Sequence, residues 1–300
     1  MRVGVIGTGY WATTVHGRGV RDHPTAELVG LWGRDPTRAQ QAAGELDTRA
    51  YPSVAALLAD VDALTFAVPP DVQVSIATQA AEAGKHVLLE KPIATSMADA
   101  RKLQSAIGRA DVASIVFFTR RFLAQHESWL REQQATGGWE CARAEFASNI
   151  FVAGNPFGNS PWRRDKGGLW DIGPHALSTL IPLLGQVESV VAGAGVRDQV
   201  HLVLQHREGR SSTASLSLTV PQAAVGSSLY VYGEHGRVEA PSGQFDVAAA
   251  YRSALDALVE QARSSPRTHA CDVHFGVEIV AILSAAEESL HTGRRVKVSI

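Results

Sequence analysis

The first residues whose types and spacing indicate chemistry lie at the start of the chain. Gly7-Thr8-Gly9-Tyr10-Trp11-Ala12 fits the pattern Gly-x-Gly-x-x-Ala, directly after an apolar run at residues 3–6 and before a segment with helical character. In this context Gly7 permits a tight turn, Gly9 lets the backbone approach a pyrophosphate, and the small Ala12 allows a helix to pack closely on a strand. Unpaired N–H groups at the start of that helix favour phosphate. The pattern therefore predicts a dinucleotide site.

The end of the second predicted strand, residues 28–32, indicates which dinucleotide binds. An NAD site usually places Asp or Glu at this tip to accept a hydrogen bond from the ribose 2′-OH, but here Gly33 is followed by Arg34. Gly33 leaves room for a 2′-phosphate, and the guanidinium of Arg34 can bind it. Asp35 comes one position later, where together with Pro36 it is expected to cap the next helix. We predict NADP(H), with NAD(H) as the alternative.

Two further groups of residues have the types needed for proton transfer. Lys91 follows a short apolar run at residues 87–89, and ligands bind beyond the carboxyl ends of strands in open α/β sheets. Its ammonium can hydrogen-bond a reacting oxygen. His175 can act as a general acid near neutral pH, and Asp171, four residues earlier, can bind a substrate hydroxyl or raise the proton affinity of the histidine. Taken alone, this pair favours a helix cap and a structural histidine; the predicted dinucleotide site and Lys91 together favour catalysis.

The elements that must position these residues change character near residue 120. Before it, short apolar runs that are typical of buried parallel strands alternate with Ala-rich helical stretches; the predicted strands are residues 3–6, 28–32, 63–68, 87–89 and 114–118. After it, period-two alternation indicates antiparallel strands, and two amphipathic helices follow. We predict an α/β protein: a Rossmann domain with a doubly wound parallel sheet at residues 1–120, then an α+β domain with an open, mostly antiparallel sheet at residues 121–300.

Composition excludes several classes of function. The 300 residues include 28 Lys and Arg against 30 Asp and Glu, so no excess of positive charge favours nucleic acid. Two cysteines, Cys141 and Cys271, lie outside any metal-binding or disulfide pattern, and we predict no metal site. No apolar run is long enough to cross a bilayer, and the N-terminus does not have the pattern of a signal peptide. A cytoplasmic protein with no membrane partner is the expectation.

Three segments occur in an order that points to a known family: GTGYWA at residues 7–12, AGKHVLLEKP at residues 83–92 and GGLWDIGPH at residues 167–175. With the later VYGEHGRVE hairpin, they resemble the glucose–fructose oxidoreductase, inositol dehydrogenase and rhizopine-catabolism (Gfo/Idh/MocA) family over nearly the whole chain. The resemblance implies a Rossmann domain followed by a substrate-binding domain whose open sheet often mediates oligomerisation. It also implies hydride transfer between a nicotinamide and a small sugar, cyclitol or related ketone, and a homodimer or homotetramer.

The resemblance assigns roles to individual residues. It implies that Lys91, Asp171 and His175 form the catalytic constellation and that the peptide bond before Pro92 is cis. Trp162 is expected to stack on a sugar ring and Arg163 to donate to substrate oxygens, with packing and a surface ion pair as the alternative. Arg120 and Arg121 match an arginine-containing turn that is expected to link the two domains. The full set of residues expected to contact the cofactor is Gly7, Thr8, Gly9, Tyr10, Trp11, Ala12, Gly33, Arg34, Pro69, Glu90 and Lys91.

Two departures from the family pattern bear on the substrate. Ser178 stands where many relatives carry Asp, and Gln73 lies in a segment where many carry His. These changes favour a less hydroxylated ketone, an imine or a modified sugar over a standard polyol. Asp272 and His274 are expected to cap a helix rather than bind metal. Two other functions stay open: a net epimerisation, elimination or hydrolysis with tightly held NAD(H), and a non-catalytic regulator that binds a dinucleotide.

Overall fold

The computed structural model describes residues 1–243 and 245–300, which form two compact units. Unit 1 comprises Met1–Leu123 and Asp246–Val277, and unit 2 comprises Ala124–Phe245 and Glu278–Ile300. Within the described residues, no helix has both the length and the apolar character required to span a bilayer.

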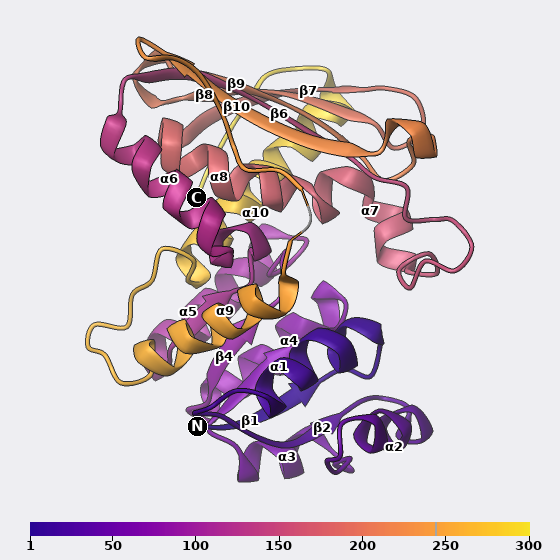
Figure 1. Ribbon diagram of the computed structural model, residues 1–300. Coiled ribbons are helices and arrows are strands. Elements are labelled where there is room, and N and C mark those ends of the chain that lie inside the picture. Colours follow the sequence, from indigo (N-terminus) through magenta and orange to yellow (C-terminus); the bar gives the residue numbers. More distant parts are fainter. Residues whose placement is uncertain (244) are drawn as a thin grey trace. The chain divides into compact units, whose positions relative to one another are not determined.

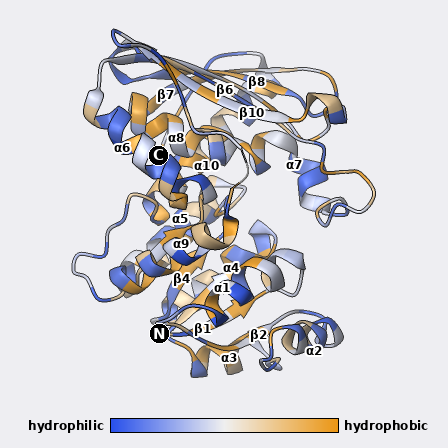
Figure 2. Ribbon diagram, viewed as in Figure 1, coloured by the Kyte–Doolittle hydropathy of each residue, from blue (hydrophilic) through white to orange (hydrophobic). Residues whose placement is uncertain are grey.

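Unit 1 is built on a parallel sheet in the order β2-β1-β3-β4-β5. The predicted strands are confirmed, with ends shifted by at most two residues: β1 (Arg2–Ile6), β2 (Glu27–Trp32), β3 (Ala63–Phe66), β4 (His86–Leu89) and β5 (Ser114–Val116). Most residues of these strands are buried, as expected for a parallel sheet covered on both faces, and Figure 2 shows hydrophobic residues in β1 and β4. Because β2 and β3 lie on opposite sides of β1, the strand order reverses there, and the carboxyl ends of β1 and β3 flank the position where such sheets bind ligands.

The helices of unit 1 follow local sequence signals. They are η1 (Ala12–Gly17), α1 (Arg18–Arg21), α2 (Pro36–Glu45), α3 (Val54–Asp60), α4 (Pro70–Glu82), α5 (Met97–Ala110) and η2 (Thr119–Phe122). Asp35 caps α2 as predicted. In α3 the buried residue is Leu57, because its side chain fills the space beside Gly4 on β1, where a Cβ atom would lie 2.9 Å from it.

The chain returns to unit 1 after it has formed most of unit 2. Helix α9 (Val247–Gln261) packs beside η1, β4 and β5, and in Figure 1 this orange segment lies among the indigo and purple elements of unit 1. The expected second domain, residues 121–300, therefore differs from the structure at residues 246–277, and also at residues 121–123, which belong to unit 1. The amphipathic pattern of a helix predicts that one of its faces is buried, but it does not predict which sheet that face covers.

Unit 2 contains a seven-stranded sheet in the order β11-β10-β6-β9-β8-β7-β12. Only β6 and β9 pair in parallel, so the predicted mostly antiparallel sheet is confirmed. Its strands are β6 (Trp139–Ala147), β7 (Val187–Ala194), β8 (Val200–His206), β9 (Ser211–Ser217), β10 (Gly226–Gly233), β11 (Gly236–Glu239) and β12 (Val296–Lys297).

Helices cover one face of this sheet. In Figure 1, α6 (Ala124–Thr136), α7 (Pro161–Asp171), α8 (Gly173–Leu184) and α10 (Val273–Thr292) lie on the same side of it. The short turns η3 (Arg207–Gly209) and η4 (Gln222–Ala224) connect strands. No helix of the described residues covers the opposite face, which matches the alternation of buried and exposed residues along β8.

Substitution of the first glycine of the motif should destabilise the fold. Gly7 has a φ of +130°, and a Cβ atom there would lie 2.5 Å from the carbonyl oxygen of Ala67. Gly7→Ala should lower the free energy of unfolding by about 2–4 kcal/mol through backbone strain and overlap. Gly9→Ala is the matched control, because a Cβ at Gly9 has no atom within 4 Å. Urea denaturation of both variants measures the difference, and equal stabilities would contradict this interpretation.

Candidate functional site

The glycine-rich loop lies between the ends of three strands. Gly7 N–H donates to Trp32 O (2.9 Å) at the end of β2, and Gly7 also abuts the backbone of Ala67 just beyond β3. Helical turns begin at Tyr10, and the segment that follows is the π-helix η1 rather than a regular α-helix. The space that a side chain on Gly9 would fill is open. A pyrophosphate fits this open position beside the first turn of a helix, so the loop suits a dinucleotide.

The tip of β2 leaves no carboxylate available for a ribose hydroxyl. A Cβ on Gly33 would lie 2.3 Å from Thr8 Cγ2, so the tip and the glycine-rich loop are adjacent. Arg34 is exposed. Asp35 Oδ1 accepts hydrogen bonds from two backbone N–H groups of α2, those of Thr37 (2.9 Å) and Arg38 (3.1 Å). Asp35 is therefore committed to its helix, as predicted.

The loop after β4 carries Lys91 and contacts the glycine-rich loop through Glu90. Trp11 Nε1 donates to Glu90 Oε1 (2.7 Å), and the backbone N–H of Lys91 donates to Glu90 Oε2 (3.2 Å). The peptide bond between Lys91 and Pro92 is cis, as the resemblance implies. Pro69 lies just beyond β3, immediately before α4. Three residues of the expected cofactor set, Trp11, Glu90 and Lys91, are thus joined by hydrogen bonds.

Gln73 shapes the backbone of the Lys91 loop. Its side chain is fully buried; Nε2 donates to Glu90 O (2.9 Å), Pro92 O (3.4 Å) and Ile93 O (3.3 Å), and Oε1 accepts from Glu90 N–H (2.8 Å). From the sequence, Gln73 is predicted only to be a departure from a family pattern. A usable signal was present, because Gln73 shares a helix face with the apolar Ala77, and a polar residue in such a stripe needs buried partners.

In unit 2 the predicted catalytic pair lies at a junction of two helices. Asp171 ends α7, and His175 lies in the first turn of α8, so the two residues do not share one helical face. Asp171 is 8% exposed, and its Oδ1 lies 3.1 Å from Arg163 Nε. The Arg163 guanidinium in turn lies over the rings of Trp162 (4.6 Å) and Phe157 (4.8 Å). The structure thus brings together Asp171 and the two predicted substrate residues.

Two acidic residues that the sequence analysis missed hold α7 in place. Asp198 Oδ2 accepts from the backbone N–H groups of Gly168 (3.2 Å) and Leu218 (2.7 Å), which fixes the middle of α7 against the end of β9. Glu287 on α10 accepts from Trp170 Nε1 (3.2 Å). Charged acceptors make strong hydrogen bonds, so these contacts restrain the helix end that carries Asp171.

The other residues singled out from the sequence lie in structural positions. Ser178 is fully buried, and its hydroxyl donates to His175 O (3.0 Å). Asp272 Oδ1 accepts from the backbone N–H of His274 (2.8 Å) at the start of α10, so its predicted role as a cap is confirmed. The same prediction for His274 is wrong, because His274 lies inside α10 and its Nδ1 is 2.8 Å from Gln104 Nε2. Burial lowers the pKa of Arg120 to about 10, and Arg121 is buried; their role as a link between domains stays a prediction.

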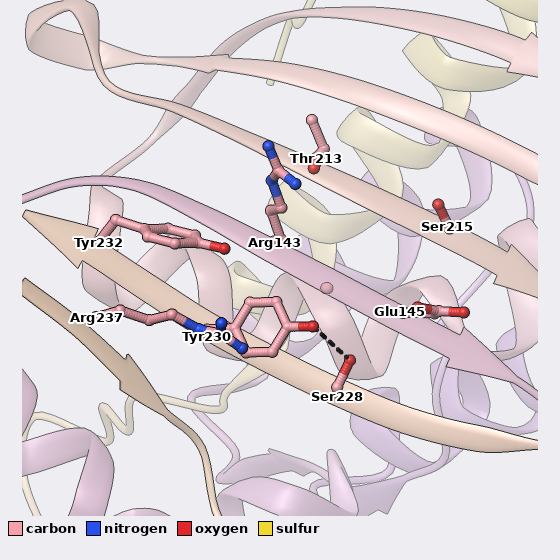
Figure 3. Close-up of a pocket in the computed structure, with 9 residues that line it drawn as sticks. Arg143, Glu145, Thr213, Ser215, Ser228, Tyr230, Tyr232 and Arg237 are labelled. Atoms are coloured by element: carbon pink, nitrogen blue, oxygen red, sulfur yellow. Dashed lines mark hydrogen bonds between the residues drawn. The ribbon is translucent and has the colours of Figure 1, made fainter.

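A separate concavity of about 410 Å³ lies on the face of the seven-stranded sheet that carries no helix (Figure 3). The Arg237 guanidinium lies 3.8 Å from the ring centre of Tyr230 there. The labelled side chains come from four strands: Arg143, Glu145, Thr213, Ser215, Ser228, Tyr230, Tyr232 and Arg237. None of the predicted site residues lines it. Across the described residues, no group of three His, Cys, Asp or Glu side chains is placed to hold a metal ion.

Comparison with known families agrees with this arrangement. A family model of oxidoreductases with an NAD-binding Rossmann fold, the Gfo/Idh/MocA model, matches residues 1–118, and the C-terminal domain model of the same family matches residues 134–239. The chain belongs to the Gfo/Idh/MocA oxidoreductase family. The resemblance inferred from the three sequence segments is therefore confirmed, as are the fold class and the assignment of the glycine-rich loop to an NAD-binding Rossmann domain.

Relatives within the Gfo/Idh/MocA family have varied names. An uncharacterized oxidoreductase of Synechocystis is 30% identical over 203 residues, which are 65% of this chain and 54% of that protein, so the match spans about half the length of that relative. D-xylose 1-dehydrogenase (NADP(+)) 2 of Haloferax volcanii is 26% identical over 91% of this chain and 92% of its own. The WlbA dehydrogenase of Bordetella pertussis, solved with NADH and UDP-GlcNAcA, shares the fold, with a TM-score of 0.87 at 23% identity over 100% of this chain and 98% of its own.

A nearly isosteric change at Gln73 tests its role in the Lys91 loop. Gln73→Glu would place a carboxylate against three carbonyl oxygens. It should lower the free energy of unfolding by about 2–3 kcal/mol, because those oxygens lose the amide donor and the new charge is buried beside them. Gln79→Glu, on the exposed face of α4, is the matched control and should change stability little. Urea denaturation measures both. A Gln73→Glu variant as stable as the control would contradict the hydrogen-bond assignment.

Proposed function

We propose that the protein is an NAD(P)-dependent oxidoreductase that transfers a hydride between a nicotinamide cofactor and a CH–OH or carbonyl carbon of a small molecule. The observation that carries the proposal is the junction in unit 1, where the open glycine-rich loop and the lysine loop are joined through Glu90. A loop that only bound a nucleotide would not require a lysine at the carboxyl end of β4. Membership of the Gfo/Idh/MocA family supports the same reading.

Residues of unit 1 would hold the cofactor. The backbone of Gly9 and the helical turn that starts at Tyr10 would bind the pyrophosphate, with the positive end of the helix dipole beside it. Gly33 and Arg34 would contact the adenosine ribose. The nicotinamide, when bound, supplies or accepts the hydride. Lys91, just past the carboxyl end of β4, would hydrogen-bond the reacting oxygen through its ammonium.

We further propose that NADP(H) is preferred over NAD(H). Arg34 is exposed beside the tip of β2, and the nearest carboxylate in sequence, Asp35, is occupied as the cap of α2. An exposed guanidinium favours a 2′-phosphate, whereas a carboxylate at the tip would repel it. The relative from Haloferax volcanii is named for NADP(+), while the WlbA dehydrogenase was solved with NADH, so the choice of cofactor must be measured on this chain.

Residues of unit 2 would move the proton. His175 would act as general acid when a carbonyl is reduced, and as base in the reverse direction, through an imidazole nitrogen. Asp171 would orient the substrate or the histidine, and its contact with Arg163 keeps its carboxylate in a fixed place. Trp162 and Arg163, already stacked on each other, would form the border of the substrate site.

The substrate class proposed is a small carbonyl compound or alcohol that is less hydroxylated than a polyol. Ser178 stands where the resemblance leads us to expect Asp, and Gln73 lies in the segment where it leads us to expect His. Both are fully buried and bound to backbone groups, Ser178 to His175 O and Gln73 to the Lys91 loop. Neither supplies a charged contact for a substrate hydroxyl. A screen of NADPH consumption over ketones, ketosugars and imines tests this choice.

The cofactor assignment is tested by titrating the protein with NADPH and NADH while following tryptophan fluorescence, since Trp11 lies in the glycine-rich loop. Arg34→Ala should weaken NADPH binding at least tenfold, about 1.4 kcal/mol, and leave NADH binding unchanged. Arg101→Ala, which removes an exposed arginine on α5, is the matched control. Tighter binding of NADH than NADPH by the wild type would overturn the preference, and binding of neither would overturn the proposed function.

The proton-transfer role is tested with His175→Ala. Loss of a general acid should lower kcat roughly 10²–10⁴-fold, while the Kd for NADPH stays within about twofold, because the cofactor contacts lie in unit 1. His201→Ala, an exposed histidine on β8, serves as control and should keep full activity. Steady-state kinetics on a substrate from the screen supply the measurement. Unchanged turnover in His175→Ala, or loss of NADPH binding, would refute the assigned role.

A further inference from the structure

A chain of buried hydrogen-bonding groups leads to Glu90 from the interior of unit 1. His16 has a side chain that is 0% exposed; its Nε2 lies 3.1 Å from Glu90 Oε1, and its Nδ1 lies 2.7 Å from Thr65 Oγ1. The Tyr251 hydroxyl reaches the same Thr65 oxygen at 2.9 Å. Thr65 and Tyr251 are fully buried. The chain therefore runs from α9 through β3 and η1 to the partly exposed carboxylate at the end of β4.

With a neutral imidazole, the four groups donate in one direction along this series of hydrogen bonds. A carboxylate only accepts hydrogen bonds, so His16 Nε2, which faces Glu90, carries a hydrogen. In neutral imidazole Nδ1 is then the acceptor, and the Thr65 hydroxyl must donate to it. Thr65 Oγ1 in turn accepts from Tyr251. Burial raises the pKa of Tyr251 far above its usual value, so its hydroxyl keeps the hydrogen it donates.

The tight packing around these residues shows that the chain is held in place. The His16 ring lies 4.7 Å from the Tyr251 ring and 6.2 Å from that of Phe117. A Cβ on Gly19, one turn after His16, would lie 2.2 Å from the Tyr251 ring, so only glycine at this position lets α9 approach. A buried network whose members are all paired is rigid and fixes its end groups.

We propose that His16 is a positioning residue for Lys91. By donating to Glu90 Oε1 beside the donation from Trp11, it fixes the carboxylate whose other oxygen holds the backbone N–H of Lys91. Thr65 and Tyr251 set the hydrogen on His16 that makes this donation. The inference rests on the proposed function, in which Lys91 contacts the reacting oxygen. In this proposal His16, which follows the glycine-rich loop, keeps Lys91 aligned with that loop.

Two substitutions at His16 separate positioning from packing. The amide nitrogen of Gln reaches the position of imidazole Nε2, so His16→Gln keeps the donation to Glu90, whereas the shorter His16→Asn reaches only toward Thr65. Hydrogen exchange resolved at the Lys91 amide should accelerate at least tenfold in His16→Asn and stay within threefold of the wild type in His16→Gln. Amides of β1 provide the reference for global opening.

With a substrate from the screen, His16→Asn should lower kcat at least tenfold with a less than threefold change in the Kd for NADPH. His16→Gln should keep most of the wild-type kcat.

The exchange experiment needs no substrate or cofactor, so its outcome is separate from that of the proposed function. Equal exchange at Lys91 in both His16 variants would overturn the inference, as would acceleration of the β1 amides together with Lys91. If His16→Asn does not fold, Thr65→Val, which removes one hydroxyl at nearly constant volume, takes its place with Thr65→Ser as its control. Thr65→Val should accelerate Lys91 exchange at least threefold; no change there would also overturn the inference. Wild-type protein that binds neither nucleotide would refute the proposed function alone.

Discussion

The carboxylate of Glu90 is the group on which the arrangement of unit 1 depends. It is 14% exposed, and a charge in such a place requires donors. Those donors come from segments far apart in the sequence: the indole of Trp11 after β1, the imidazole of His16 on η1 and the backbone of Lys91 after β4. The need to satisfy one charge thus keeps the glycine-rich loop beside the lysine loop. Gln73 fixes the backbone on the other side of the same loop.

In unit 2, carboxylates that accept hydrogen bonds likewise hold the candidate site in place. Asp198 accepts backbone N–H groups at the middle of α7, and Glu287 accepts the indole N–H of Trp170 near its end. Asp171 then pairs with Arg163, whose guanidinium is stacked on an aromatic ring. In both units a carboxylate with several donors restrains a short irregular segment, and irregular segments are where functional groups are displayed. The regular elements supply the rigid frame to which these segments are attached.

Local sequence patterns predicted those parts of the structure that local physics determines. Buried parallel strands are continuous apolar runs, so all five strands of unit 1 were found, and the cap formed by Asp35 follows from short-range hydrogen bonding. The placement of α9 in unit 1 was not predicted, because an amphipathic pattern does not indicate which element its apolar face packs against. The candidate site was predicted by motif, but Gln73 and Tyr251 act through contacts 17 and 186 residues away in sequence. Helix and strand periodicity relate residues only a few positions apart, so they cannot predict such contacts. The preference for NADP(H) remains a prediction, since Arg34 is exposed and its expected partner is a small molecule.

A crystal structure of the protein with NADPH tests most directly whether the loop after β1 and the loop after β4 form one dinucleotide site. The expected result is a pyrophosphate against the backbone at Gly9 and the turn that begins at Tyr10, a 2′-phosphate bound by Arg34, and the nicotinamide ring beside Lys91. A dinucleotide bound away from the carboxyl ends of β1 and β3, or with its nicotinamide directed away from Lys91, would contradict the proposed oxidoreductase.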